Sequence, residues 1–165
     1  MRADSAFYGH RAVSAAIGAG AQVSVTVRQD LRIRAAISEI AADAWTKIEY
    51  TDAILDADTG LWISRAEVAE IAFTAFTSKA KALQVPGRLV VRRIPDFRPE
   101  GDGLFDVWRF HAFFTTSDLD TVTADKTHRA HAVIEQVHAD LKASALAHLP
   151  SGKFCANAAW LVCAV

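Results

Sequence analysis

Five side chains that could bind a metal ion or a phosphate recur at steps of three and four residues, and they are His128, His131, Glu135, His138 and Lys142. On an α-helix this spacing places all of them on one stripe. A neighbouring stripe, which we expect to face a core because it is apolar throughout, consists of Ala130, Ile134, Val137, Leu141 and Ala145. Glu135 is therefore expected where a buried face meets a polar one. At such a boundary packing can hold a carboxylate rigidly while its oxygens stay open to a metal ion.

The same stripe has a simpler interpretation as the solvated flank of a helix. Contacts between Glu135 and its neighbours His131 and His138 would stabilise such a flank without any ligand, and a run of charges is usually a solvated face. Glu135 and His138 also form the Glu-x-x-His step of di-metal carboxylate helix bundles. That architecture needs a second such helix, and the sequence has one copy of the step, so a metal-binding helical protein is the less favoured alternative.

The composition favours one folded domain without a strong overall charge. The chain has 165 residues, of which 52% are hydrophobic, which excludes a disordered protein and leaves apolar surface for a partner. A net charge of −1 gives no global argument for nucleic-acid binding. Residues 77–98, however, contain Lys79, Lys81, Arg88, Arg92, Arg93 and Arg98 against Asp96 alone. This basic run predicts either a solvated strand and turn or a surface that faces phosphates.

The two cysteines and the apolar end of the chain predict a cytoplasmic protein without a membrane segment. Cys155 and Cys163 fit neither a zinc site nor a disulfide scaffold, and we interpret them as core thiols in a reducing cytosol. Residues 154–165 have the length of a buried core helix and are too short to span a bilayer. The first residues show no signal peptide.

The order of the expected elements predicts an α/β fold in three parts. Residues 1–44 predict the end of a strand, a helix over 10–17, a strand over 22–28 and a helix over 32–40, which together form a partial catalytic core. Residues 45–117 predict an antiparallel β-rich insertion subdomain. Residues 118–165 return to helices, with Thr127 as the expected N-cap. We expect truncation at both ends, because two core strands are too few to be stable alone.

Four segments, taken in this order, resemble the DDE transposases of bacterial insertion sequences. They are Ala3-Asp-Ser-Ala-Phe-Tyr8, Thr26-Val-Arg28, the segment 106–115 and the segment 125–142. More narrowly, the chain resembles the branch whose ribonuclease-H-like core is interrupted by a β-rich insertion. The resemblance implies an incomplete ribonuclease-H-like core that is interrupted by the insertion and closes in helices.

In that family two aspartates and one glutamate hold two divalent metal ions, Mg²⁺ or Mn²⁺, for DNA strand cleavage and strand transfer. The resemblance makes Asp4 the second aspartate and Glu135 the glutamate, so both are implied as catalytic and metal-binding residues. The family signature is Tyr, two residues, Arg, three residues, Glu, six residues, Lys. Here Glu135 and Lys142 match it, whereas His128 and His131 replace the Tyr and the Arg.

The resemblance also implies DNA at the ends of an insertion sequence as the partner. The implied DNA-binding residues are Arg129, His131, Lys142, Arg92 and Arg93. Only three residues precede Asp4, so the first aspartate of the family is missing, and we expect this chain alone to be an inactive fragment. Robust strand cleavage by the purified chain with Mg²⁺ or Mn²⁺ would contradict that expectation.

A non-catalytic product is the second interpretation. It would bind DNA through residues 79–98, or it would dimerise with itself or with a full-length transposase through exposed apolar faces. Salt-sensitive DNA binding without cleavage would distinguish it from an inert fragment.

Overall fold

The computed structural model describes residues 1–50, 54–55, 62–63, 65–95, 108–130, 137, 140, 143 and 151–164. Two compact units, Met1–His128 and Arg129–Val165, make up the chain. The first unit contains a mixed sheet with helices, and the second contains the helix α5 (Phe154–Ala164). The predicted α/β class is confirmed at this level.

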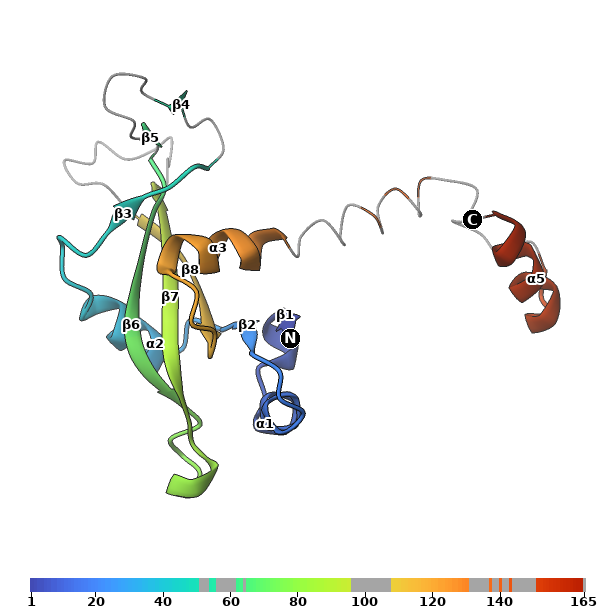
Figure 1. Cartoon of the computed structure of the whole chain (residues 1–165), viewed down its shortest axis with the longest axis horizontal. Helices are drawn as coiled ribbons and strands as arrows, with labels where there is room; N and C mark the ends of the chain where they lie inside the picture. Colours follow the sequence, from blue (N-terminus) through green and yellow to red (C-terminus); the bar gives the residue numbers. More distant parts are fainter. Residues whose placement is uncertain are drawn as a thin grey trace. The chain divides into compact units, whose positions relative to one another are not determined.

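A six-stranded sheet in the order β1-β2-β8-β7-β6-β3 forms the centre of the first unit (Figure 1). Its strands are β1 (Arg2–Ala3), β2 (Ser24–Thr26), β3 (Thr46–Lys47), β6 (Glu67–Ala75), β7 (Val85–Pro95) and β8 (Trp108–Thr115). β1 and β2 are parallel, and the remaining pairs are antiparallel. β4 (Ile54–Leu55) and β5 (Trp62–Ile63) form a separate pair. The strands predicted for the core and those predicted for the insertion therefore share one sheet, joined where β2 pairs with β8.

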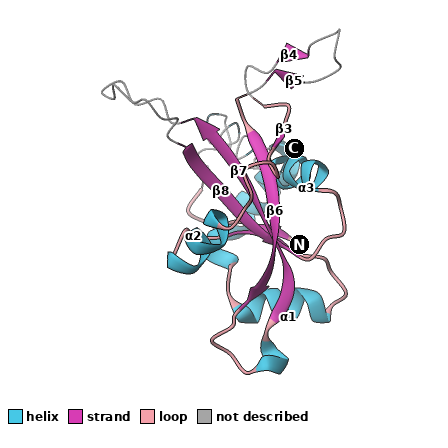
Figure 2. Ribbon diagram, turned by 90° about the vertical axis from the view of Figure 1, so that its left-hand side faces the viewer, coloured by secondary structure: helices cyan, strands magenta, loops and turns pink. Residues whose placement is uncertain are grey.

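Helices cover both faces of this sheet. α1 (His10–Gly18) and α2 (Leu31–Ser38) contribute to one core, whereas α3 (Thr121–Arg129) contributes to the other. Figure 2 shows α2 and α3 on opposite sides of the strands. The first core includes Val13, Val25, Ile33, Ile37, Phe73, Leu89, Val91, Ala112 and Phe114. The second includes Ile48, Ala66, Val68, Val90, Phe113 and Ala124. Alternate residues of β7 and β8 enter alternate cores, as the two-residue period of a strand requires.

Side-chain caps and 3₁₀ turns complete the first unit. The side chain of Asp30 accepts hydrogen bonds from the backbone nitrogens of Arg32 (3.0 Å) and Ile33 (2.9 Å), which fixes the start of α2. The 3₁₀ turns are η1 (Ser5–Phe7) after β1 and η2 (Lys81–Leu83) between β6 and β7. α1 ends at Gly18, one residue beyond the helix predicted over 10–17.

The helix expected from Thr127 begins earlier, at Thr121, so the prediction of Thr127 as an N-cap is wrong. Asp120 supplies the cap instead, because its carboxylate accepts a hydrogen bond from the backbone nitrogen of Thr123 at 2.9 Å. The prediction that the apolar stripe is buried is wrong at its two described residues, because Ala130 and Val137 are exposed.

The second unit differs from the expectation of a buried closing helix. α5 forms, but Phe154 and Cys155 are exposed, so the prediction of Cys155 as a core thiol is wrong. Among the described residues of this unit Asn157 is buried, and its side-chain amide pairs with the backbone nitrogen and carbonyl oxygen of Ser151, at 3.0 Å and 2.6 Å. This pairing fixes the turn before α5. No helix in the described part of the chain is long and apolar enough to cross a membrane.

Candidate functional site

Asp4 lies immediately after β1, at the carboxyl end of the parallel pair β1 and β2. Its backbone is extended, and the preceding residue, Ala3, pairs with Val25. In α/β sheets ligands bind at the carboxyl ends of the strands. Asp4 is exposed, and its Oδ1 accepts a hydrogen bond from the backbone nitrogen of Ala6 at 2.8 Å. The carboxylate thus caps η1 and remains accessible, as a ligand of a hard cation such as Mg²⁺ must be.

The last turn of α3 is attached to the same pair of strands. His128 lies with Nδ1 2.7 Å from the hydroxyl of Ser24 and Nε2 3.1 Å from the hydroxyl of Thr26. Its ring is parallel to that of Phe113, at 4° and with 4.0 Å between the ring centroids. Arg2 donates a hydrogen bond to the carbonyl oxygen of Thr127 at 2.7 Å. The structure therefore brings α3 onto the strands that end beside Asp4.

Arg92, a predicted DNA contact, faces α3. Its guanidinium donates to the carboxylate of Asp125 at 2.7 Å, and Asp125 is fully buried. The same guanidinium lies over the ring of Tyr50, 5.2 Å from the centroid.

Arg93, the next predicted DNA contact, points to the opposite face of the sheet. It donates from Nε to Glu67 at 2.6 Å, and its guanidinium lies over the rings of Trp45 and Trp108, at 4.2 Å and 4.5 Å from the centroids. Both arginines already have a carboxylate partner, and their roles in DNA binding stay predictions.

The remaining predicted site residues belong to the second unit. Arg129 ends α3 and is partly buried. The side chains of His131, Glu135, His138 and Lys142 lie outside the described residues, so their predicted roles stay predictions. Within the part that is described, no group of three or more His, Cys, Asp or Glu side chains could hold a metal ion. A metal site at Asp4 would need ligands from elsewhere in the chain.

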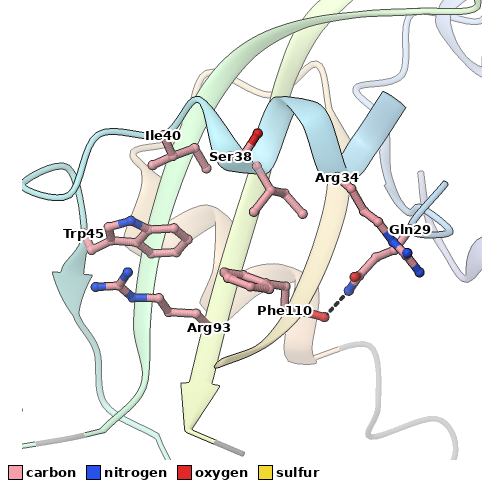
Figure 3. Close-up of a pocket in the computed structure, with 8 residues that line it drawn as sticks. Gln29, Arg34, Ser38, Ile40, Trp45, Arg93 and Phe110 are labelled. Carbon is pink, nitrogen blue, oxygen red and sulfur yellow. Dashed lines mark hydrogen bonds between the residues drawn. The ribbon is translucent and has the colours of Figure 1, made fainter. Parts of the chain in front are cut away.

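A pocket of about 420 Å³ lies between α2 and the sheet, and sequence reasoning did not find it. It is lined by Gln29, Arg34, Ile37, Ser38, Ile40, Trp45, Arg93 and Phe110. Figure 3 shows the ring of Phe110 beside Trp45, and Gln29 donating a hydrogen bond to the carbonyl oxygen of Phe110. Apolar walls with a few polar groups at the rim are typical of small-ligand pockets. No local pattern could predict it, because the lining side chains come from α2, the segment that contains Trp45, β7 and β8.

Comparisons with known proteins do not assign the chain to a family. No protein-family model matches it, and no curated protein matches it at a significant level. A functional proposal therefore rests on the four sequence motifs and on the geometry around Asp4 and α3.

The surroundings of His111 predict a dependence of stability on pH. Burial lowers the pKa of His111, and the positive charges of Arg92 and Arg109 lower the pKa further, against an opposing effect of Asp125. Because the folded state then binds a proton less readily than the unfolded state, stability is lost as pH falls through the unfolded pKa of about 6.5. We expect the free energy of unfolding to decrease between about pH 7 and pH 5, and His111→Gln to reduce this slope. Urea unfolding at each pH measures it. An unchanged slope in the variant would contradict the assignment, and the comparison at pH 8 is the control.

Proposed function

We propose that this chain is part of a DDE transposase, with a core of the ribonuclease-H-like type. The four motifs quoted above support the proposal, because they follow one another in the order of that family. The structural observation that carries it furthest is the position of Asp4. It lies after β1, which is parallel to β2 and connected to it through α1, and this is a position from which a carboxylate can reach a ligand.

In this proposal Asp4 and Glu135 share divalent cations. Carboxylate oxygens are the hard ligands that Mg²⁺ and Mn²⁺ prefer, and the exposed carboxylate of Asp4 fits that requirement. When bound, the ions would activate a water or a 3′-hydroxyl and neutralise the leaving oxygen of a phosphodiester displacement. Arg129, His131 and Lys142 would hold the DNA backbone in register without reading bases.

Mn²⁺ binding to the purified chain tests this proposal. We expect the wild-type chain to bind Mn²⁺, and Asp4→Asn and Glu135→Gln each to weaken binding by at least about tenfold, because even changes in the outer shell of a metal site cost about 10–100-fold. Water-proton relaxation during a Mn²⁺ titration measures the affinity. The matched control is Asp43→Asn, which removes an exposed carboxylate in a turn.

Two results would contradict the proposal of a metal site at Asp4 and Glu135. One is a wild-type chain that does not bind Mn²⁺. The other is an Asp4→Asn variant that binds Mn²⁺ as tightly as the wild type. Strand cleavage is a separate readout, since cation binding requires only the ligands, whereas cleavage requires the complete set of three acids.

The second candidate is a non-catalytic DNA-binding protein, and one observation favours it. Lys79 and Lys81 are exposed in the turn between β6 and β7, where their charges can meet phosphates. Duplex DNA binding that weakens with salt, disappears in the Lys79→Ala/Lys81→Ala variant and is unchanged in Asp4→Asn would favour this candidate over the metal-dependent enzyme.

A further inference from the structure

The side of α3 that faces the sheet is unusual because most of it is polar. An amphipathic helix normally turns an apolar stripe toward the core. Here Ala124 is the apolar member, and the other three residues of the stripe are Thr121, Asp125 and His128. Polar groups in such a place need partners, since burying them unpaired is costly.

Each polar residue of the stripe has a partner on a different strand. Thr121 donates to the carboxylate of Glu70 on β6 at 2.6 Å. Asp125 accepts from Arg92 on β7, and His128 meets Ser24 and Thr26 on β2. Successive helix residues are about 100° apart around the axis, so a slip of α3 by one residue would break all these pairs together. Apolar contacts alone would oppose such a slip less, because they lack the distance and angle limits of hydrogen bonds.

The buried ion pair is better suited to fixing position than to adding stability. Burying two charges costs free energy that their attraction often only offsets, and the best-attested role of such pairs is to specify register. Arg88 pairs with Glu70, the partner of Thr121. The Nε atoms of Arg88 and Arg92 are buried without a hydrogen-bond partner among the described residues, so this set of contacts leaves some polar groups unsatisfied. A set of contacts selected for stability alone would satisfy these donors or replace them with apolar groups.

His128 has the most restricted geometry of the three. Stacking on Phe113 fixes the plane of its ring, and the two hydroxyls fix the rotation within that plane. His128 therefore restrains the last turn of α3, and Glu135 follows it by seven positions in the sequence.

We infer that Asp125 and His128 are positioning residues, which fix the rotation and register of α3 on the sheet. Any effect of this positioning on a metal site rests on the proposed function, whereas the positioning itself does not.

Distances between two spin labels test the positioning. The labels are placed at Glu39→Cys and Thr123→Cys, both exposed and both in the first unit, in the full chain with Cys155→Ser and Cys163→Ser. We expect one narrow distance distribution without further substitutions. His128→Phe keeps an aromatic ring for stacking but removes both ring nitrogens, and we expect it to lose the single narrow distribution.

Three further variants show whether His128 acts through its hydroxyl partners. Ser24→Ala/Thr26→Ala should reproduce the effect of His128→Phe, and combining all three substitutions should add nothing. Asp125→Asn should also broaden the distribution. The control is Val13→Ala, which weakens the core on the opposite face and should leave the distribution narrow. A broad distribution before any of these substitutions, or a narrow one in His128→Phe and in Ser24→Ala/Thr26→Ala, would overturn the inference.

A Mn²⁺ titration of the same variants separates this inference from the proposed function. If Glu135 is a metal ligand, His128→Phe should weaken Mn²⁺ binding by about tenfold, the lower end of what outer-shell changes cost. If the wild-type chain does not bind Mn²⁺ while the label distances respond as expected, the positioning holds and the proposed metal site fails.

Discussion

Replacing Asp125 with Ala should lower the free energy of unfolding by about 3–5 kcal/mol, because removing one partner of a buried ion pair leaves the other charge without compensation. Asp125 is fully buried, and the side chain of Arg92 is 13% exposed. We expect the lower end of the range, since Arg92 keeps its contact with the ring of Tyr50 and a small contact with solvent. Urea unfolding followed by tryptophan fluorescence measures the change.

Two variants show whether the loss comes from the uncompensated charge. Arg92→Met/Asp125→Leu should recover most of the stability, because an apolar pair of similar volume can replace a buried ion pair without loss. Glu49→Ala removes a partner of Lys126 in an exposed pair with a distance of 3.7 Å, and should cost less than about 1 kcal/mol. If Asp125→Ala costs no more than Glu49→Ala, the buried pair does not hold α3 in the way we describe.

Local patterns in the sequence predicted several elements close to their observed positions. The alternation over 22–28 contains β2, the helix predicted over 32–40 overlaps α2, and the helix predicted over 10–17 nearly coincides with α1. These predictions succeed because propensity and periodicity act over a few neighbouring residues.

Pairing between distant strands had no such local signal. Val25 pairs with Phe114, which is far along the chain, and no local feature of either segment identifies its partner strand. For this reason the sequence predicted two separate structural parts where the structure has one sheet. The position of Asp4 at the end of a parallel pair depends on the same kind of long-range contact. Only the resemblance to a family drew attention to that residue beforehand.

The orientation of α3 could not be predicted from the sequence, for a different physical reason. A search for apolar periodicity selects stripes such as the one that includes Ala130 and Val137, whereas the sheet-facing side of α3 carries Asp125 and His128. Polar residues on the buried side are recognised only with their partners, which come from strands distant in the sequence. The opposite orientations of Arg92 and Arg93 could have been predicted, because neighbouring residues of a strand point to opposite faces.

Phe114→Ala should be as destabilising as any substitution in the core opposite α3. Phe114 is fully buried, and its ring centroid lies 6.2 Å from that of Tyr8 and 6.4 Å from that of Phe73. Truncating a buried phenylalanine removes apolar contacts and leaves a cavity that the neighbours fill only in part, so we expect a loss of about 3–5 kcal/mol in the free energy of unfolding. Urea unfolding measures it.

The ring of Phe114 lies so close to Gly87 that a side chain at position 87 would overlap with it. A Cβ atom at Gly87 would lie 2.7 Å and 2.8 Å from two ring carbons of Phe114, and 2.6 Å from the carbonyl oxygen of Thr115. Gly87→Ala alone should therefore cost about 1–3 kcal/mol through overpacking. Gly18→Ala is the matched control, because a Cβ there meets nothing within 4 Å, and it should change stability little.

Combining the two substitutions separates the ring from the backbone as the source of the overlap. Without the ring, the methyl group of Gly87→Ala still meets the carbonyl oxygen of Thr115, which cannot move without disturbing the pairing of β7 with β8. The double variant should therefore lose less stability than the sum of the single changes, yet more than Phe114→Ala alone. Strict additivity would mean that the ring of Phe114 does not occupy the space beside Gly87, and that the core on this face is arranged differently.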